Sequence, residues 1–596
     1  MKALRACLRL DRAGRFVWQA GPGWCLANAV LVIVQGLLPL AALYLLKRIV
    51  DTTAAMVAGS GQLQWGNLGT LLVLAACVAL AVDIGRQVGD HVSKAQAAVV
   101  ADHVFDRIHQ QSILLDLAYY ENPAYFDTLH RAQTEGPYRP TQIVNGLVGV
   151  IQGAISLLAI SGLLVTFHPI LPVLLCGAAL PAVAVRYHFA GQHYAWQQRR
   201  NREERQARYY NWMLTGETHA KEIRLFNLGP RFADRFRQLR HLLRSESLIL
   251  SQKRSLAEAG ARAVSTAVLF SLMAWVCVRT VSGAITLGAM VMFVQAFQKG
   301  AGFLGQLLGG LSDLYENQLF LTQFFRFMTL APAIDMPLNP LPVPTPVQAG
   351  LTVECLNFRY PAGEQVVLKD ISFTLAPGEV VALVGDNGTG KTTLVKLLCR
   401  LYDPNSGSIT LDGQDIRGFD PVDYRRRFSV IFQDFIQYQL TARDNIQFGN
   451  TALAAGTEAI KKAATKAGVA KTIDALPLGY DTVLGKLFDN GRELSVGQWQ
   501  KLALARAFYR DADIVVLDEP TSALDVKSEY ALFQAFRELL DGRSALIISH
   551  RFSTVRLADR ILVLENGCIV ESGSHEQLMA LEGRYAGMVC TQADRD

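Results

Sequence analysis

The chain has 596 residues, which is long enough for two or more domains, and 51% of them are hydrophobic. Its formal net charge of +6 is too small to indicate nucleic-acid binding. The nine cysteines are scattered and none forms a Cys-x-x-Cys pair, so the sequence indicates neither a disulfide framework nor a zinc site. The hydrophobic residues gather in the first half, in stretches of roughly 20, the length that crosses a bilayer.

The N-terminal segment 1–20 is basic and has leucines between its charged residues. This pattern is typical of an amphipathic elbow helix on the inner membrane surface, and a plain signal that keeps the N-terminus inside is the alternative. The apolar run that follows, from Trp24 to Leu46, is too long for the core of a cleavable signal peptide. We therefore expect a retained first span.

Six apolar spans are predicted in residues 21–328, the expected transmembrane domain. They lie at about Trp24–Leu46, Leu68–Val88, Gln142–Phe167, Ile170–Tyr187, Ala261–Val281 and Leu287–Leu308. The long connections 89–141 and 188–260 are charged and helical in pattern, whereas the loop 50–67 has neither lysine nor arginine. By the positive-inside rule, we expect a multi-pass protein of the cytoplasmic (inner) membrane with both termini in the cytoplasm.

A Pro-rich segment, 329–349, predicts an extended linker between two domains. From residue 350 to 596, short β-branched runs alternate with helical patterns. The runs Val380–Val384, Ile514–Leu517 and Leu546–Ser549 are continuously apolar, as expected of strands buried in a parallel sheet. The predicted fold is therefore a membrane α-helical domain followed by an α/β domain with a phosphate-binding loop.

Residues 385–392 read Gly-Asp-Asn-Gly-Thr-Gly-Lys-Thr, a phosphate-binding loop between a predicted strand and a predicted helix. Backbone N–H groups and the positive end of the helix attract phosphate. Lys391 is expected at the β- and γ-phosphates of ATP, and Thr392 at Mg²⁺. A Gly-rich turn without a ligand is the alternative. The candidate ATP-binding residues here are Gly385, Asp386, Asn387, Gly388, Thr389, Gly390, Lys391, Thr392 and Thr393.

Asp518 and Glu519 follow four apolar residues, at the edge where α/β sheets bind ligands. Asp518 is a candidate Mg²⁺ ligand. Two adjacent carboxylates can divide metal binding and base catalysis between them. An isolated Asp-Glu pair is a weak signal, but the strand before it and Pro520–Asp525 after it strengthen the interpretation.

The phosphate loop, the run Leu494–Gln498, the Asp-Glu pair and His550 occur in one order. This ordered set resembles the ATP-binding cassette (ABC) ATPase. Six spans before one cassette resemble the half-transporter of the ABC exporter type. The resemblance covers nearly the whole chain and is specific in the cassette. It implies alternating access of the spans, driven by ATP binding and hydrolysis.

The resemblance also implies roles for single residues. Glu519 matches the general base, Gln433 the glutamine that reaches the metal and the water, and His550 the histidine at the γ-phosphate. Tyr360 resembles the aromatic residue that stacks on adenine, with core packing as the alternative. Asp525, at the end of the run after the acidic pair, is a further candidate ATP-binding residue.

The signature residues Ser495, Val496, Gly497 and Gln498 resemble the element that covers the γ-phosphate of the other subunit. A serine N-cap and free N–H groups at a helix start attract anions. Most of the family has glycine at the position of Val496, and the segment 484–491 is longer than in most exporters. Because one cassette cannot complete such a site, we expect a homodimer, with a related half-transporter as the alternative partner.

The cassette motifs look like those of exporters of lanthipeptides and related peptides, so peptide export is the predicted function. A lipid or glycolipid flippase and a multidrug efflux pump are the alternatives, and an importer or ATP-gated channel on the same fold is another. Short coupling helices are expected around Asp116–Thr128 and Asn211–Phe226. Polar residues of the spans are candidates for the pathway or for interhelical hydrogen bonds: Gln35, Asp83, Asn145, Gln152, Gln295, Gln298 and Lys299.

Overall fold

The computed structural model divides the chain into two compact units. One unit comprises residues 1–113 and 127–330, and the other comprises residues 114–126 and 331–596. The structure describes residues 10–57, 65–122, 125, 129, 136, 138–166, 169–361, 363–453, 456–519, 536, 540, 542–549, 555, 556 and 558–593.

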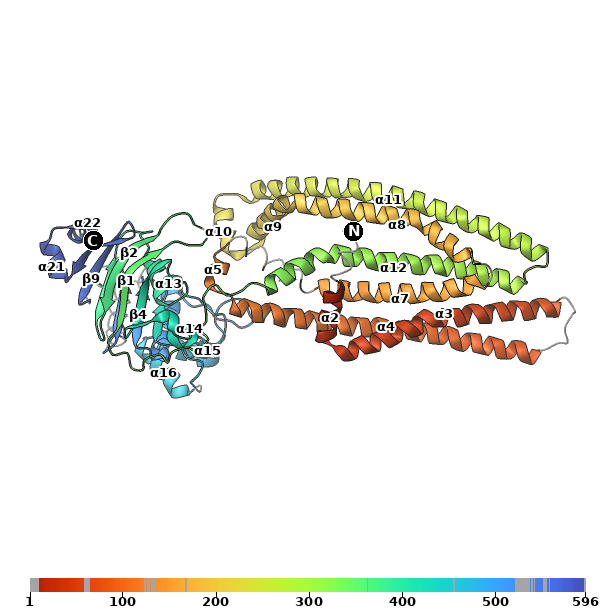
Figure 1. Cartoon of the computed structure of the whole chain (residues 1–596). Coiled ribbons are helices and arrows are strands. Elements are labelled where there is room, and N and C mark those ends of the chain that lie inside the picture. Colours follow the sequence, from red (N-terminus) through yellow and green to blue (C-terminus); the bar gives the residue numbers. More distant parts are fainter. Residues whose placement is uncertain are drawn as a thin grey trace. The chain divides into compact units, whose positions relative to one another are not determined.

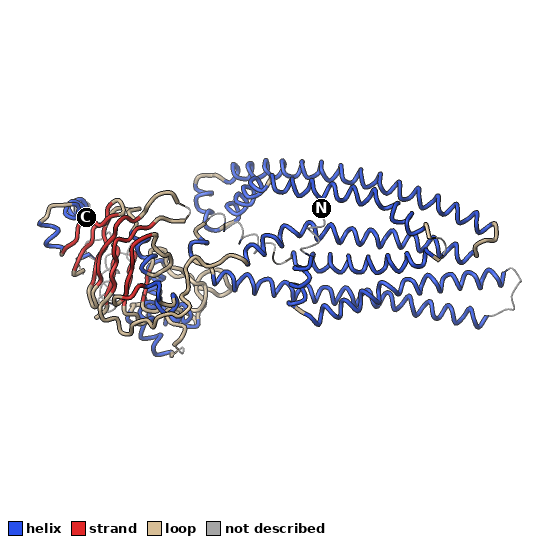
Figure 2. The backbone as a smooth tube through the Cα atoms, in the orientation of Figure 1, coloured by secondary structure: helices blue, strands red, loops and turns tan. Residues whose placement is uncertain are grey.

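The described part of the first unit is helical, without strands (Figure 2). Helices α7 and α12 run side by side, as do α8 and α11 (Figure 1). The helices are α2 (Leu10–Ala20), α3 (Pro22–Val57), α4 (Trp65–Leu114), α7 (Arg139–Val165), α8 (Leu171–Arg199), α9 (Asn201–Thr215), α10 (Glu217–Leu225), α11 (Gly229–Val281) and α12 (Leu287–Met328).

Among the described residues, five helices are long and apolar enough to cross a membrane, at 22–57, 66–114, 139–165, 171–193 and 229–281. They overlap the first five predicted spans, with differences of one or two residues at Phe167 and Ile170. The sixth predicted span lies in α12, which is one continuous helix. Gln295, Gln298 and Lys299 interrupt its apolar sequence, so length and composition alone do not mark α12 as a span.

The core of the helical unit lies where α3, α7, α8, α11 and α12 meet. Leu43, Leu164 and Phe293 are at most 2% exposed in this cluster. Helices α7 and α12 approach closely at glycines, since a Cβ atom on Gly310 would lie 2.7 Å from the carbonyl oxygen of Gly146. Small residues at such contacts allow helices to pack tightly in a membrane protein.

The second unit contains two sheets. One is antiparallel with the order β2-β1-β4-β5, and the other has the order β10-β9-β3-β8-β7-β6, with parallel pairing throughout except between β9 and β10. The strands are β1 (Leu351–Phe358), β2 (Leu368–Leu375), β3 (Val380–Val384), β4 (Ser406–Leu411), β5 (Gln414–Asp415), β6 (Phe428–Ile431), β7 (Ile514–Asp518), β8 (Ser544–Ile548), β9 (Arg560–Glu565) and β10 (Cys568–Gly573).

The parallel core of the larger sheet confirms the sequence prediction. Strand β3 coincides with its predicted apolar run, β7 and β8 overlap theirs within one or two residues at each end, and β7 and β8 are buried at every residue. The antiparallel sheet was not predicted. Its strand β1 pairs with β2 through register shifts, which break the regular alternation of buried and exposed residues that marks a strand in a sequence.

Short helices and turns connect these strands. The described helices of the second unit are α5 (Leu117–Tyr120), α13 (Lys391–Leu398), η1 (Ile416–Gly418), α14 (Pro421–Arg425), α15 (Ala442–Gln447), α16 (Thr457–Lys466), α17 (Ala470–Asp474), η2 (Gly479–Asp481), α18 (Val496–Arg510), α21 (His575–Ala580) and α22 (Arg584–Ala593). Helices α5 and α10 lie within the two segments predicted to hold coupling helices.

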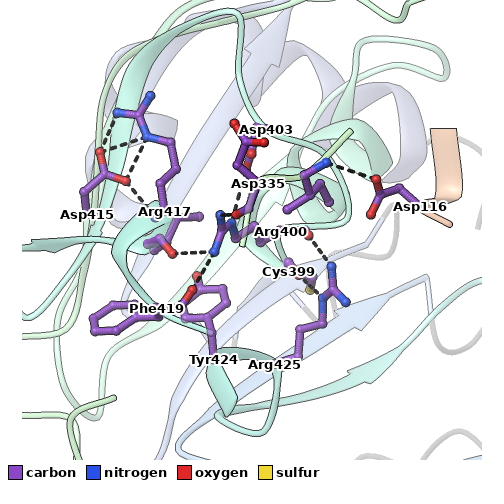
Figure 3. Close-up of polar contacts among 12 residues, drawn as sticks. Asp116, Asp335, Cys399, Arg400, Asp403, Asp415, Arg417, Phe419, Tyr424 and Arg425 are labelled. Atoms are coloured by element: carbon purple, nitrogen blue, oxygen red, sulfur yellow. Dashed lines mark hydrogen bonds and ion pairs between the residues drawn. The ribbon is translucent and has the colours of Figure 1, made fainter. Parts of the chain in front are cut away.

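The start of the linker is held against the second unit by a buried arginine (Figure 3). Arg400 is 0% exposed, and its guanidinium donates to the carbonyl oxygens of Ile416 (3.0 Å), Phe419 (2.8 Å) and Asp335 (2.9 Å). Asp335 belongs to the segment predicted as a linker, whose residues from 331 on group with the second unit. A buried guanidinium needs such acceptors, so Arg400 ties the linker to the loop around η1.

Candidate active site

The phosphate loop joins β3 to α13, as predicted. Gly388 (φ 81°) and Gly390 (φ 108°) adopt left-handed conformations, which favour glycine. A Cβ atom on Gly390 would lie 2.7 Å from the Leu368 side chain, whereas around Gly388 nothing lies within 4 Å of that position. The loop backbone is therefore open at Gly388, where a phosphate group can approach the N–H groups.

Lys391 begins α13 and its ammonium folds back over the phosphate loop. Its Nζ donates to the carbonyl oxygens of Gly385 (2.9 Å) and Asp386 (3.0 Å), and the residue is 6% exposed. Burial lowers the pKa of Lys391, while the charges of Glu519 and Asp518 oppose that effect. The arrangement places a positive charge inside the loop that is expected to bind phosphate.

Thr392 and Asp518 meet although they are 126 positions apart in the sequence. The Thr392 hydroxyl donates to Asp518 Oδ2 at 3.1 Å, and Asp518 is 1% exposed at the end of β7. Burial raises the pKa of Asp518, and the hydrogen bond from Thr392 lowers it. A buried carboxylate beside a hydroxyl is an oxygen donor set that suits Mg²⁺.

No group of three His, Cys, Asp or Glu side chains able to hold a metal occurs among the residues that the structure describes. Mg²⁺ is usually held by one or two carboxylates together with substrate phosphates and water, and Asp518 offers one such carboxylate. Thr392 and Asp518 would hold the ion directly or through water. When bound, Mg²⁺ neutralises charge that develops on the phosphates.

Glu519 and Gln433 are hydrogen-bonded to each other. Gln433 Nε2 donates to Glu519 Oε2 at 2.7 Å, and the Glu519 N–H donates to the Ile548 carbonyl oxygen at 2.9 Å. Glu519 has a φ of 46°, a conformation that costs about 1–3 kcal/mol for a residue other than glycine. Strained backbone of this kind is found at functional sites, and here it orients the candidate base.

Tyr360 lies beside α13. Its hydroxyl shares a 2.9 Å hydrogen bond with the Thr393 hydroxyl, and the Lys396 ammonium lies 5.5 Å from its ring centroid. The rings of Phe358 and Tyr402 contact it edge-on, at 5.0 Å and 5.4 Å. Tyr360 is half-buried and packs against the hydrophobic core, as the alternative interpretation predicted. Its ring nevertheless lies next to α13, the helix that follows the phosphate loop.

Ser495 is the N-cap of α18, as predicted. The Gln498 N–H donates to the Ser495 hydroxyl at 3.3 Å, and the Gln498 side chain accepts from the Ser495 N–H at 2.8 Å, which forms a capping box. Val496, at the first helical position, is 55% exposed. The signature therefore presents a capped helix start at the surface of the chain.

Two candidate residues, His550 and Asp525, lie outside the described residues. Within the phosphate loop, Asp386 and Asn387 are exposed. The Asp386 carboxylate forms a 2.7 Å ion pair with Arg584, a residue that the sequence interpretation missed. Nothing in the local sequence around Arg584 marks it, because the contact spans 198 positions.

Three glutamines of the helical unit form a hydrogen-bonded series. Gln306 on α12 donates to Gln152 on α7 (3.0 Å), Gln152 donates to Gln35 on α3 (3.1 Å), and Gln35 donates to the Gly85 carbonyl oxygen on α4 (2.6 Å). For Gln35 and Gln152 the structure thus shows the predicted alternative of interhelical hydrogen bonds. Gln306 was not predicted, and its side chain ends the series at an exposed position.

The comparisons with known proteins agree with this geometry. Residues 368–522 match the ABC transporter family. The subtilin transport ATP-binding protein of Bacillus subtilis is 27% identical over 92% of this chain and 88% of its own length. The nisin transport ATP-binding protein of Lactococcus lactis subsp. lactis is 26% identical over 96% of this chain and 94% of its own length.

Two further similarities concern the exporter architecture. The ATP-dependent lipid A-core flippase of Burkholderia pseudomallei (strain 1710b) is 36% identical over 63% of this chain and 62% of its own length. A solved structure of a bacterial Atm1-family ABC exporter with ATP bound has a TM-score of 0.80 and 26% identity, and the match covers 95% of this chain and 98% of that one.

The helical unit, the α/β unit with its phosphate loop and acidic strand end, and these similarities lead to one conclusion. Several apolar helices of membrane length precede a single ATP-binding domain. Exporters of this fold generally function as dimers. The chain therefore has the architecture of an ABC exporter half-transporter, in which an ATPase domain with the ABC transporter family match at 368–522 drives transport across a membrane.

Proposed function

We propose that this exporter transports a peptide. Similarity along the whole chain carries the proposal. The relatives named for subtilin and nisin transport match 92% and 96% of the chain, so the similarity includes the membrane helices that contact the cargo. The cassette motifs that resemble those of lanthipeptide exporters support the same substrate class.

Lipid flipping is the second candidate. The lipid A-core flippase has the higher identity, 36%, but over 381 residues, which is 63% of the chain. That match leaves more than a third of the chain uncovered, whereas the matches to the subtilin and nisin transport proteins extend along nearly all of it. The cargo is recognised by the helical unit, so the longer matches favour peptide over lipid.

We propose the following division of work at the ATP site. The phosphate-loop N–H groups and Lys391 hold the β- and γ-phosphates, and Thr392 and Asp518 serve Mg²⁺. Glu519, held by Gln433, accepts the proton of the attacking water. Positioning and electrostatic stabilisation supply most of the catalysis in phosphoryl transfer. His550 is proposed at the γ-phosphate and Asp525 near the ATP site.

We propose that two copies of the chain form the active transporter. The capped start of α18 at Ser495, with Gly497 beside it, supports this because N–H groups at a helix start bind anions. In the homodimer, each signature would cover the γ-phosphate bound by the other copy. Both termini and the ATPase domain are proposed to be cytoplasmic, with the helices in the inner membrane, because arginines crowd the segment 188–260.

Mass spectrometry of the medium and of the membranes of the native cells tests the cargo. Wild-type cells are compared with Glu519→Gln cells and with Glu354→Gln cells, the last as a control because Glu354 is an exposed carboxylate on β1. Peptide export predicts a peptide that disappears from the medium and accumulates inside the Glu519→Gln cells alone. An unchanged medium with a lipid retained in the inner leaflet would instead identify a flippase and overturn the peptide proposal.

A further inference from the structure

A short segment that follows α4 packs with the ATPase domain. Residues 114–126 group with the second unit, and Leu117 and Ala118 of α5 contact its hydrophobic core. The Asp116 carboxylate accepts the backbone N–H groups of Ala333 and Ile334 in the linker. The segment is thus held by apolar contacts of α5 and by the hydrogen bonds from the backbone at 333 and 334 to Asp116. Neither kind of contact involves the ATP site.

Glu121, the residue after α5, makes a different contact. One carboxylate oxygen pairs with the Lys396 ammonium at 2.6 Å, and the other accepts the Tyr402 hydroxyl at 2.6 Å. The side chains of Glu121 and Lys396 are 36% and 19% exposed. A hydrogen bond between two charged groups is stronger than one between neutral groups, so this contact holds Lys396 more firmly than a neutral partner would.

Both partners of Glu121 touch Tyr360, the candidate for stacking on adenine. Lys396 lies 5.5 Å from the Tyr360 ring centroid, and the Tyr402 ring contacts the Tyr360 ring edge-on at 5.4 Å. Lys396 is one helical turn after Thr393, and both residues reach Tyr360 from the same face of α13. Glu121 therefore holds the two groups that, with Phe358 and Thr393, surround this ring.

The Glu121 carboxylate affects the protonation of both of its partners, Lys396 and Tyr402. Burial lowers the pKa of Lys396, but the hydrogen bond and charge of Glu121 together with the contact to Tyr360 outweigh burial and raise the pKa overall. Burial and the hydrogen bond to Glu121 both raise the pKa of Tyr402. Without the carboxylate, the half-buried ammonium would lose its counterion and seek water, and it would leave its place beside the Tyr360 ring.

We infer that Glu121 is a positioning residue for the base pocket at Tyr360, and that through it nucleotide binding and docking of the segment 114–122 stabilise each other. The inference rests on the proposed role of Tyr360 in stacking on the base. Nucleotide that stacks on a correctly placed ring stabilises the Lys396–Glu121 pair and hence the docked segment. Such coupling is reciprocal, so a docked segment also favours nucleotide binding.

The test measures ATP hydrolysis by the full chain in nanodiscs. Glu121→Gln is expected to raise the KM for ATP about fivefold, which lies in the range of typical coupling between sites. Its kcat at saturating ATP should change less than about twofold, because the phosphate loop and Glu519 are untouched. Tyr402→Phe, which removes one of the two contacts, is expected to raise KM by a smaller factor.

Asp116→Asn is the matched control, because it loosens the same segment without touching Lys396 or Tyr402. Its KM for ATP is expected to rise less than about twofold, because weaker docking costs some nucleotide affinity while Glu121 still holds Lys396 and Tyr402. A rise in KM as large as that of Glu121→Gln would show a general effect of undocking and would overturn the inference. An unchanged KM in both Glu121→Gln and Tyr402→Phe would overturn it as well.

Hydrogen exchange gives a second readout, which a merely structural role would not change. The non-hydrolysable analogue AMP-PNP should slow exchange of amides 114–122 in the wild type and in Asp116→Asn, but not in Glu121→Gln. Equal protection in all three would refute the coupling. Tyr360→Ala tests the proposed stacking role of Tyr360 separately from the role of Glu121. An unchanged KM for ATP in that variant would reject the base pocket itself.

Discussion

Replacement of Arg400 by methionine should destabilise the ATPase domain strongly. Methionine fills much of the same volume but donates no hydrogen bonds to the carbonyl oxygens of Ile416, Phe419 and Asp335 (Figure 3). Each buried polar group left without a partner costs about 1–3 kcal/mol. Both residues would occupy the same left-handed conformation (φ 49°), so backbone strain cancels in the comparison.

We expect a net loss of about 3 kcal/mol, because three carbonyl acceptors and the Asp403 carboxylate, 3.3 Å from the guanidinium, lose their donor, while removal of the desolvated guanidinium offsets part of the cost. For a domain of about 150–250 residues, 1 kcal/mol shifts the melting temperature by about 2–4 °C, so the expected decrease is about 6–12 °C. Thermal unfolding of the full chain in nanodiscs measures it, and the transition of the ATPase domain is identified by its increase on addition of ATP.

Arg426→Met is the matched control. Arg426 pairs with Asp423 at 2.8 Å, and their side chains are 61% and 57% exposed. An exposed ion pair contributes at most about 1 kcal/mol, so this variant should unfold close to the wild-type temperature. If Arg400→Met and Arg426→Met unfold within about 2 °C of each other, the argument that Arg400 holds the linker and the η1 loop together is wrong.

Four further predictions concern the proposed site and topology. Lys391→Ala should weaken ATP binding about tenfold to 100-fold through loss of a charged donor, and an unchanged Kd in a titration with labelled nucleotide would contradict the loop assignment. Glu519→Gln should abolish nearly all phosphate release while ATP remains bound, and sustained turnover would reject its role as base. Ser495→Ala removes an N-cap worth about 1 kcal/mol and should lower ATP turnover without loss of ATP binding, whereas full turnover would exclude the signature from the site. A reporter inserted after Ala55 should be exposed outside the cytoplasm, and a cytoplasmic signal would overturn the topology.

Much of the site could be predicted because its parts are local patterns. The phosphate loop is contiguous, and Gly388 and Gly390 with Lys391 form a pattern that needs no tertiary contact to be recognised. Ser495 precedes an apolar-periodic helix with Gln498 three positions later, which is the sequence signature of a capping box. Asp518 follows a continuously apolar strand, so its place at the sheet edge was also predictable.

Other parts depend on pairings between distant segments, and no local pattern encodes them. The β1–β2 pairing contains register shifts, so its alternation is irregular and the antiparallel sheet escaped prediction. Gln306 lies on α12, whose apolar sequence is broken by polar residues, and its hydrogen bond to Gln152 depends on how α7 and α12 pack. Such packing follows from side-chain shape across the interface rather than from periodicity.

The sequence by itself determined the domain order, the apolar helices and the chemistry of the ATP site, because hydrophobic periodicity and the phosphate loop are properties of neighbouring residues. Only the tertiary structure decided which distant side chains meet. Glu121 and Lys396 are 275 positions apart, and Gln433 and Glu519 are 86 apart. These pairs form only because chain folding brings segments that are far apart in the sequence together, and hydrophobic periodicity and local motifs carry no information about such meetings.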